Sequence, residues 1–253
     1  MLGDVQASDA LFELTSSDDT ELRVRAVLAL VHLGDQRGID AFRTIVTGDD
    51  KKLRKSMLTR ARLVGWLSEN TSCSKFTSPA AQKLFRELTL NAAEYAVRGR
   101  AASLLTGASD PETISCLIEA CADESDFVRH LAITSLMKTT EPSRFKTLNS
   151  FLADSSPLCR RTAIELIASL LSETDSSTDT GLSISDSVSA VAPLLSDDDA
   201  VVRQAAIRCL FQFYTQAPKQ VGRHVVSIRR LTFSDPDRTI RFLANRLLTQ
   251  IEE

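Results

Sequence analysis

Apolar residues recur along this chain at the spacing of a helix that buries one side, and each recurrence is built around an arginine. The residue before the arginine is apolar or cysteine, and apolar residues follow three and seven positions later. Offsets of −1, +3, +4 and +7 lie on one face of a helix with 3.6 residues per turn. Each recurrence therefore predicts a helix with one buried face. The seven arginines are Arg23, Arg54, Arg98, Arg129, Arg160, Arg203 and Arg241.

Two further positions are shared by these seven segments. The residue three positions after the arginine is alanine in six of them and Met57 in the other, so a neighbouring helix can approach closely. Four positions before the arginine, two segments carry Ser125 and Ser156 and five carry an acid. Oxygens at this point accept the free N–H groups of a helix start, so these residues predict N-caps. The acids are Asp19, Asp50, Glu94, Asp199 and Asp237.

A second set of helices is predicted between the arginine helices, so that each arginine helix becomes the second helix of a hairpin. A short helix over Gln6–Leu14 opens the chain. The other predicted first helices are Asp35–Val46, Pro79–Leu90, Asp110–Ala122, Glu141–Leu152, Asp186–Leu195 and Pro218–Thr232.

Seven consecutive hairpins favour an all-α solenoid, because a single hairpin cannot bury its apolar face but a stack of hairpins can. We expect residues 1–253 to form one such domain. Repeats one to five cover about residues 1–171, and repeats six and seven cover about residues 188–253. The segment between them, residues 172–187, is rich in Ser, Thr and Asp and predicts a polar inserted loop, whose role the sequence leaves open.

Composition agrees with a helical protein and narrows its class. Nine glycines, seven prolines and 6% aromatic residues argue against a β-sandwich or barrel. We expect no membrane association, because no apolar stretch is long enough to span a bilayer. Five dispersed cysteines favour reduced thiols and a cytoplasmic location over a disulfide framework.

The repeat pattern consists of an acid, an apolar–Arg pair whose arginine stands four residues after the acid, and then Ala and Leu at helical spacing. This pattern resembles HEAT repeats. The 31-residue versions are most similar to the phycobilisome-lyase (PBS-lyase) subtype. The resemblance covers nearly the whole chain and implies a right-handed, armadillo-like α-solenoid. It also implies that the turn acids and helix arginines form a ladder between repeats, which would give the seven arginines a structural role. One solenoid fold hosts many functions, so the fold does not identify the chemistry.

No catalytic or metal-binding motif emerges from the sequence. The three histidines, at positions 32, 130 and 224, do not pair with one another or with glutamate at ligand spacing. Cys116 and Cys121 are predicted to be core thiols, since their interval does not place them on one metal-binding face. The chain also contains neither a phosphate-binding glycine loop nor a nucleophile elbow. We therefore predict no metal, no catalytic residue and no cofactor, apart from a bilin in the alternative given below.

Candidate binding residues come from the helix face opposite the buried stripe. In HEAT-like stacks the second helices line a concave groove, so positions one, five and eight after each arginine should face it. These positions carry five fixed positive charges and one histidine but a single acid, Glu165, although the chain carries a net charge of −3. The candidate groove residues are Lys55, Arg62, His130, Arg161, Arg208, Phe211, Phe242 and Arg246.

Charge is also unevenly distributed along the chain. Residues 165–199 hold eight acids and no Lys or Arg, whereas residues 201–246 hold nine bases and two acids. A basic groove favours a protein partner with an acidic surface. Nucleic acid is less favoured because the chain as a whole is acidic and carries few aromatic residues.

The sequence therefore predicts a non-catalytic scaffold or adaptor. The alternative, which rests on repeat type, is a phycobilin lyase or chromophore-handling subunit that acts on phycobiliproteins, with the basic groove residues meeting the bilin propionates.

Overall fold

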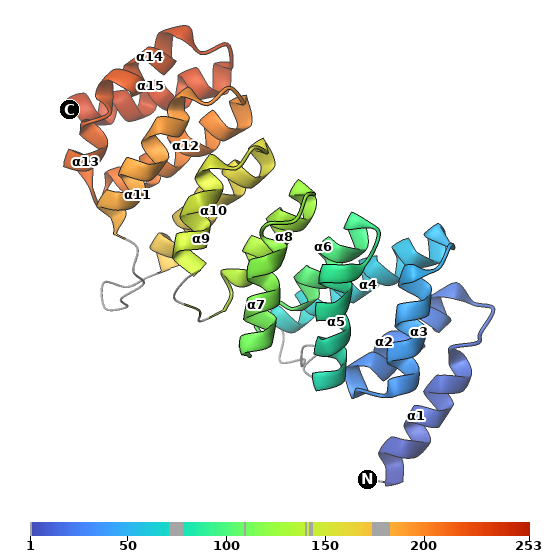
Figure 1. The fold of residues 1–253 in the computed structure, drawn as a ribbon. Helices are drawn as coiled ribbons and strands as arrows, with labels where there is room; N and C mark the ends of the chain where they lie inside the picture. Colours follow the sequence, from blue (N-terminus) through green and yellow to red (C-terminus); the bar gives the residue numbers. More distant parts are fainter. Residues whose placement is uncertain (1, 71–77, 109, 140, 142–143, 174–182) are drawn as a thin grey trace. The chain divides into compact units, whose positions relative to one another are not determined.

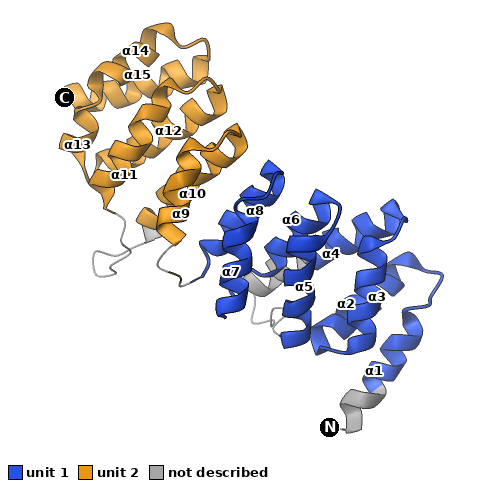
Figure 2. Cartoon of the chain, in the orientation of Figure 1, with its two compact units in different colours: residues 1–140 blue, residues 141–253 orange. Residues whose placement is uncertain are grey.

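The computed structural model describes residues 2–70, 78–108, 110–139, 141, 144–173 and 183–253, and it describes the side chains in these ranges except at 2–6, 62–70 and 173. The described residues are helical, with connecting turns and no strand. Two compact units divide the chain, residues 1–140 and 141–253 (Figure 2). The expected all-α solenoid is confirmed: every one of the seven arginines lies in the second helix of a hairpin (Figure 1).

Unit 1 contains four hairpins, and the second helix of each packs on that of the next. Its first helices are α1 (Leu2–Leu14), α3 (Gln36–Thr47), α5 (Pro79–Asn91) and α7 (Pro111–Ala120). Its second helices are α2 (Thr20–Leu33), α4 (Lys51–Asn70), α6 (Tyr95–Leu104) and α8 (Asp126–Leu136).

Unit 2 contains three hairpins arranged in the same way. Its first-helix segments are α9 (Arg144–Ser150) with the 3₁₀ turn η1 (Phe151–Ala153), α11 (Ile184–Val191) with η2 (Ala192–Ser196), and α13 (Pro218–Gly222) with α14 (Val225–Ser234). Its second helices are α10 (Pro157–Glu173), α12 (Ala200–Tyr214) and α15 (Arg238–Glu252).

The single helix predicted over Pro218–Thr232 is wrong, because the chain forms two helices there. The N–H of His224 donates to the carbonyl of Val221, a tight turn that ends α13, and a new helix begins at Val225. The break lets α13 pack on α11 and α12 while α14 packs along α15.

The predicted polar insertion is shorter at both ends than residues 172–187. Ser172 and Glu173 continue α10, and Ser183 caps α11 by accepting the Asp186 N–H at 3.3 Å. Residues 174–182 lie outside the described part of the chain. The unit boundary at residue 140 precedes this segment, so the single-domain organisation stays a prediction.

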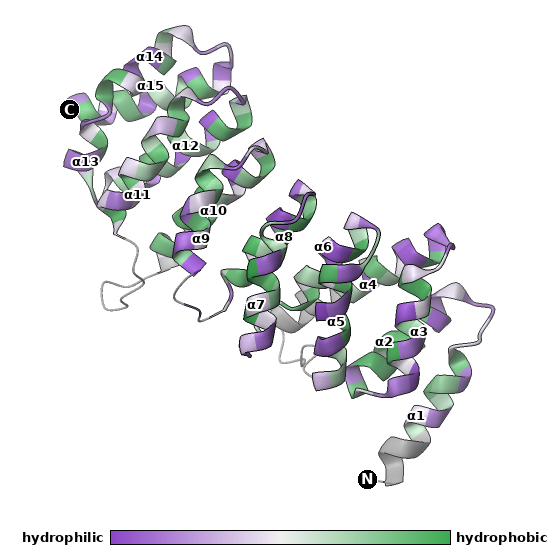
Figure 3. Ribbon diagram, in the orientation of Figure 1, coloured by the Kyte–Doolittle hydropathy of each residue, from purple (hydrophilic) through white to green (hydrophobic). Residues whose placement is uncertain are grey.

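The buried stripe of each second helix lies where the periodicity placed it. The alanines three positions after the arginine are buried in every hairpin that has one, and Ala132, Ala163, Ala206 and Ala244 are fully enclosed. First helices add larger side chains, including an edge-to-face pair between Phe42 and Phe85 with ring centroids 5.7 Å apart. In Figure 3 the hydrophobic residues of each unit gather mainly where its helices face one another.

Four of the seven predicted N-caps are confirmed by side-chain cap bonds, and two stand at the N-cap position without one. Side-chain oxygens of Asp19, Asp50, Asp199 and Asp237 each accept a backbone N–H from the first turn of their helix. Glu94 and Ser125 make no side-chain cap bond, although both occupy the N-cap position. Glu94 instead reaches the second helix of the preceding hairpin, as described next.

Each of the seven repeated arginines, called the register arginines from here on, binds the turn that precedes its own helix. All seven donate to the backbone carbonyl six residues earlier, at N–O distances from 2.6 to 3.0 Å, as Arg98 does to Ala92 and Arg203 to Asp197. This bond satisfies a carbonyl at a helix end, which would otherwise be left without an intrahelical partner.

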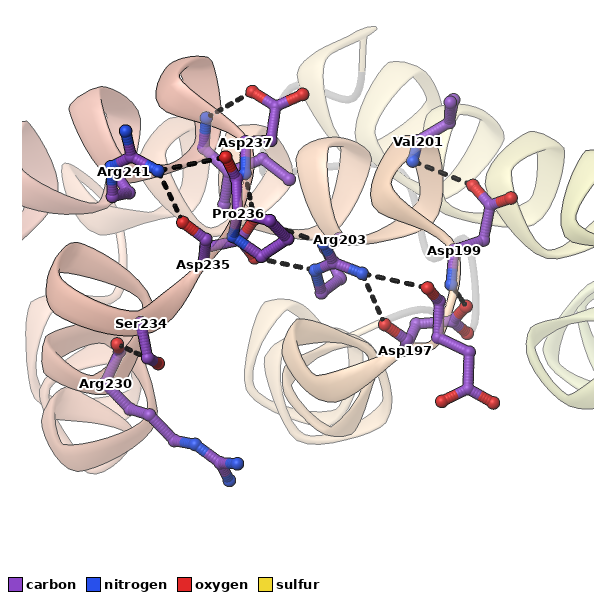
Figure 4. A network of polar contacts seen from close by, with 12 residues as sticks. Asp197, Asp199, Val201, Arg203, Arg230, Ser234, Asp235, Pro236, Asp237 and Arg241 are labelled. Atoms are coloured by element: carbon purple, nitrogen blue, oxygen red, sulfur yellow. Dashed lines mark hydrogen bonds and ion pairs between the residues drawn. The ribbon is translucent and has the colours of Figure 1, made fainter.

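Several of these arginines also reach the next hairpin of their unit. Arg203 donates two hydrogen bonds to the carboxylate of Asp235, at 2.7 and 3.1 Å, and both side chains are buried (Figure 4). Equivalent forked pairs join Arg98 to Asp123 and Arg160 to Asp197. In the second hairpin, Arg54 bonds Glu94 at 2.6 Å. Forked pairs of this kind have strong directional preference, so they set the spacing of successive hairpins.

The aspartates of these forked pairs occupy a position that the sequence interpretation missed. They stand six residues before the next arginine, whereas the acids singled out in the sequence stand four residues before it. Besides the arginine, Asp123, Asp197 and Asp235 each accept the N–H of the residue two positions later, at 2.8 to 2.9 Å. The sequence carries this signal, since aspartate stands at this position in four of the seven repeats.

Burial by itself would raise the pKa of Asp235. The hydrogen bonds from Arg203 and from the Asp237 N–H, together with the charges of Arg203 and Arg241, outweigh burial and hold that pKa below its ordinary value. The same balance lowers the pKa of Asp123 and of Asp197.

Ala244→Leu should destabilise unit 2, because the fully enclosed position leaves no room for a larger side chain. We expect a loss of about 1–3 kcal/mol in the free energy of unfolding, measured by urea titration. Asn245→Leu, at the exposed neighbouring position of α15, is the control and should change stability by no more than about 0.5 kcal/mol. Equal losses in the two variants would contradict the packing described.

Asp235→Ala should lower stability by about 3 kcal/mol, because it leaves the buried Arg203 without its carboxylate. A depressed pKa means that the contribution is complete above the unfolded-state pKa of about 3.9 and is lost as the pH falls through the folded-state pKa. The difference in the free energy of unfolding between variant and parent should therefore narrow below about pH 4.

The control for this prediction is Glu252→Ala, which breaks the exposed pair with Arg229 and should cost less than about 1 kcal/mol. The stability difference between Asp235→Ala and the parent could instead stay constant down to strongly acidic pH. In that case the charge of the carboxylate is not what stabilises the turn.

Candidate protein-interaction face

We define the second-helix face of each unit as the exposed side chains on and beside the second helices, away from the buried stripe. In unit 1 the second helices are α2, α4, α6 and α8, and in unit 2 they are α10, α12 and α15. The candidate groove residues whose side chains the structure describes lie on these helices.

In unit 2 the structure brings three of the candidate residues together. The guanidinium of Arg246 on α15 lies over the ring of Phe211 on α12, 5.3 Å from its centroid, and 5.9 Å from the ring centroid of Phe242. Phe242 is 61% exposed. The two rings hold the cation by cation–π attraction, and Arg246 forms no ion pair with any described residue.

The other two candidate cations of unit 2 differ in their surroundings. Arg161 is exposed on α10 and bonds Glu165 one turn later at 2.7 Å, so its charge is largely balanced. Arg208 lies on α12 beside a shallow hollow of about 430 Å³ between α10 and α12, which Glu165 and Gln212 also line. Within the described residues Arg208 has no carboxylate in ion-pair contact.

Unit 1 carries a larger hollow, of about 660 Å³, bounded by residues of α4, of α6 and its N-cap, and of α8. Lys55, one of the candidate residues of this unit, lines it together with Lys51, one turn earlier on α4. Tyr95 and Phe127 form its aromatic part, with ring centroids 6.0 Å apart in an edge-to-face arrangement. The guanidinium of Arg100 lies 5.2 Å from the centroid of Phe127.

The remaining candidates of unit 1 do not join this hollow. His130 is half-buried on α8. Arg62 belongs to α4, and its side chain is outside the described part of the structure. The sequence interpretation considered only positions one, five and eight after each register arginine. It therefore missed Lys51 and Tyr95, three residues before such an arginine, Phe127, two before, and Arg100, two after. An aromatic residue just inside the helix start in two adjacent repeats was the available signal.

Profiles of the HEAT-repeat family match two parts of the chain. One, described as HEAT repeats, covers residues 82–168, and one, described as HEAT repeat, covers residues 188–217. These matches support the HEAT-repeat resemblance. Neither is described as the PBS-lyase subtype, which stays a prediction. No curated protein sequence shows significant similarity to this chain.

Solved structures of repeat proteins resemble the chain in fold. The archaeal HEAT-like repeats protein from Thermococcus onnurineus NA1 is 15% identical with a TM-score of 0.54, covering 97% of each chain. Computationally designed armadillo repeat proteins for modular peptide recognition are 15% identical with a TM-score of 0.52, covering 88% of this chain and 97% of theirs. A designed armadillo repeat protein in complex with the peptide (KR)4 is 13% identical with a TM-score of 0.50, covering 96% of this chain and 98% of its own. At these identities the likeness concerns the fold alone.

The described residues hold no group of three or more His, Cys, Asp or Glu side chains placed to bind a metal ion. No helix among them combines the length and the hydropathy needed to cross a bilayer. Cys116, Cys121, Cys159 and Cys209 are buried and form no disulfide, and burial raises the pKa of Cys116 to about 11 and that of Cys209 to about 12. Cys73 lies outside the described residues.

These four thiols should react slowly with iodoacetamide in the folded protein at pH 8, because thiolate is the reactive form and burial suppresses it. Mass spectrometry of peptides should show alkylation of Cys209 at least about tenfold slower in buffer than in urea, since its pKa is well above 8 when folded. Equal rates in the two conditions would contradict the burial of this thiol.

Proposed function

We propose that this protein is a non-catalytic interaction scaffold that binds an acidic surface or segment of a partner protein through its second-helix faces. The observation that carries the proposal is which arginines already have a carbonyl or carboxylate partner and which have none in the described part of the chain. The register arginines are engaged by turn carbonyls, and several also by carboxylates, whereas Arg208 and Arg246 meet no carboxylate among the described residues.

The arrangement around Arg246 suits a protein contact. Cations held over aromatic rings lose less side-chain entropy on binding, and aromatic residues and arginine are enriched among residues that contribute most to interface energies. Phe242 and Arg246 are both exposed, so a partner carboxylate can approach the guanidinium from solvent.

The neighbours in fold support a peptide or protein ligand, since a designed armadillo repeat protein binds the basic peptide (KR)4. The cations of the present faces would favour the opposite charge on a ligand. The chain as a whole carries −3, so the basic faces differ in sign from the bulk and would steer an acidic partner to them. We also keep the cytoplasm as the proposed location.

The phycobilin-lyase alternative rests on repeat type, and no contact among the described residues favours a bilin over a peptide carboxylate. Mixing the protein with phycocyanobilin tests it directly. We expect no red-shifted fluorescent band, and such a band would favour the chromophore-handling function over the scaffold.

Panning the protein against a random peptide library displayed on phage should enrich sequences rich in Asp and Glu, because only acidic segments satisfy the unpaired cations. Arg208→Glu with Arg246→Glu should lower affinity for the enriched peptides at least about tenfold and flatten the salt dependence of association. Both side chains are exposed, so the unfolding free energy should change little.

The matched control is Arg223→Glu with Arg230→Glu. These residues are exposed at the first helices of the same unit, and their reversal changes the net charge equally. The control should retain peptide affinity. Enrichment of peptides without acidic residues, or equal losses in the two double variants, would refute the proposal.

A further inference from the structure

We infer that the hollow of unit 1 is an anchor pocket for an acidic peptide segment that carries one large apolar side chain, with the anchor seated on Tyr95 and Phe127 and the flanking carboxylates on Lys51 and Lys55. The inference rests on the proposed function and makes it specific, by naming the subsite and the chemistry of its ligand.

The pocket has the size and the lining of a side-chain subsite. Its volume of about 660 Å³ falls in the range of about 300–1,000 Å³ that is usual for ligand pockets. Leu58 and Ala96 provide aliphatic surface beside the two aromatic rings. An apolar side chain that enters the pocket would therefore lose contact with water on several sides at once, and this burial stabilises the bound state.

A glycine makes room for this aromatic part. A methyl group at Gly99 of α6 would stand 2.8 Å from a ring carbon of Phe127 and 3.2 Å from Leu131. Because Gly99 lacks that carbon, the ring of Phe127 can lie against α6, where Tyr95 and Arg100 contact it. Tyr95 itself remains 56% exposed, so the pocket presents an aromatic surface to solvent.

The charge on one side of the pocket requires a negative ligand. Lys51 and Lys55 are four residues apart on α4 and therefore lie on the same side of the helix. Both are exposed, and neither forms an ion pair with a described residue. Like charges at this spacing repel each other, and a carboxylate between them would relieve the repulsion. Glu94, which also lines the pocket, is already engaged by Arg54 at 2.6 Å.

A polypeptide fits these features better than a nucleic acid strand does. Two unpaired lysines stand beside one hollow of limited size, whereas strands of nucleic acid are bound by long basic grooves that follow successive phosphates. An apolar anchor with a few carboxylates matches the pocket in both shape and sign.

Fluorescence anisotropy with labelled acidic peptides tests the inference on the full chain. The probes are a short peptide of Asp and Glu with a central Phe, the same peptide with a central Ala, and single-stranded DNA of equal charge. For the parent protein we expect the Phe peptide to bind at least about tenfold more tightly than the Ala peptide, the gain expected from burying a large aromatic side chain.

Two variants locate that gain. Tyr95→Ala should shrink the Phe-to-Ala ratio to about twofold, because the anchor loses its aromatic partner. Lys51→Glu with Lys55→Glu should weaken both peptides at least about tenfold and abolish the salt dependence of association. Lys83→Glu with Lys138→Glu, an equal charge change at exposed sites elsewhere in unit 1, should leave both affinities unchanged. Thermal unfolding of each variant verifies that it is folded.

The possible failures are distinguishable. If acidic peptides bind the parent but the Phe-to-Ala ratio is the same in Tyr95→Ala, or the control pair of lysines matters as much as Lys51 and Lys55, the pocket assignment is overturned while the scaffold stands. If no acidic peptide binds the parent, both fall. Tighter binding of the DNA than of either peptide would overturn the choice of a protein ligand.

Discussion

The arginine in the first turns of each second helix organises the stack within each unit: it binds the turn of its own hairpin, and Arg54, Arg98, Arg160 and Arg203 also bind a carboxylate of the next hairpin of the same unit. One part of the guanidinium bonds the carbonyl six residues before it, and in the forked pairs the remaining N–H groups bind an aspartate of the following turn. That aspartate in turn accepts a backbone N–H of its own turn. A rigid planar cation thus satisfies polar groups at helix ends, where neither helix can do so itself.

This engagement separates structural cations from binding cations. A guanidinium saturated by carbonyls and a buried carboxylate has little capacity left for a partner, as at Arg203, so the net basic character of a helix is a poor guide to its binding surface. Arg161 makes the same point on the surface, because Glu165 one turn away balances it. Lys51 and Lys55 in unit 1 and Arg208 and Arg246 in unit 2 meet no carboxylate among the described residues, so their charges are available to a partner.

Aromatic rings turn these available charges into defined surfaces. Phe211 and Phe242 restrain Arg246, and the Tyr95–Phe127 pair borders the two lysines of unit 1. Each cluster draws on neighbouring second helices, so its geometry depends on the spacing that the arginine–aspartate pairs set. In this way the interaction that stabilises the stack also positions the residues proposed to bind a partner.

The sequence by itself determined the helices, their buried faces and most of their caps, because those depend on local periodicity and on neighbouring residues within one turn. It also placed Phe211, Phe242 and Arg246 on one exposed face, which the structure brings into contact. Only the tertiary structure decided that the ladder acids stand at Asp123, Asp197 and Asp235, that the helix after Pro218 breaks, and that Tyr95 and Phe127 border Lys55. The ladder pairs and the aromatic border of Lys55 join residues tens of positions apart, and the break after Pro218 lets α13 and α14 pack on different helices. The distance between two helices is set by packing, which no local pattern encodes.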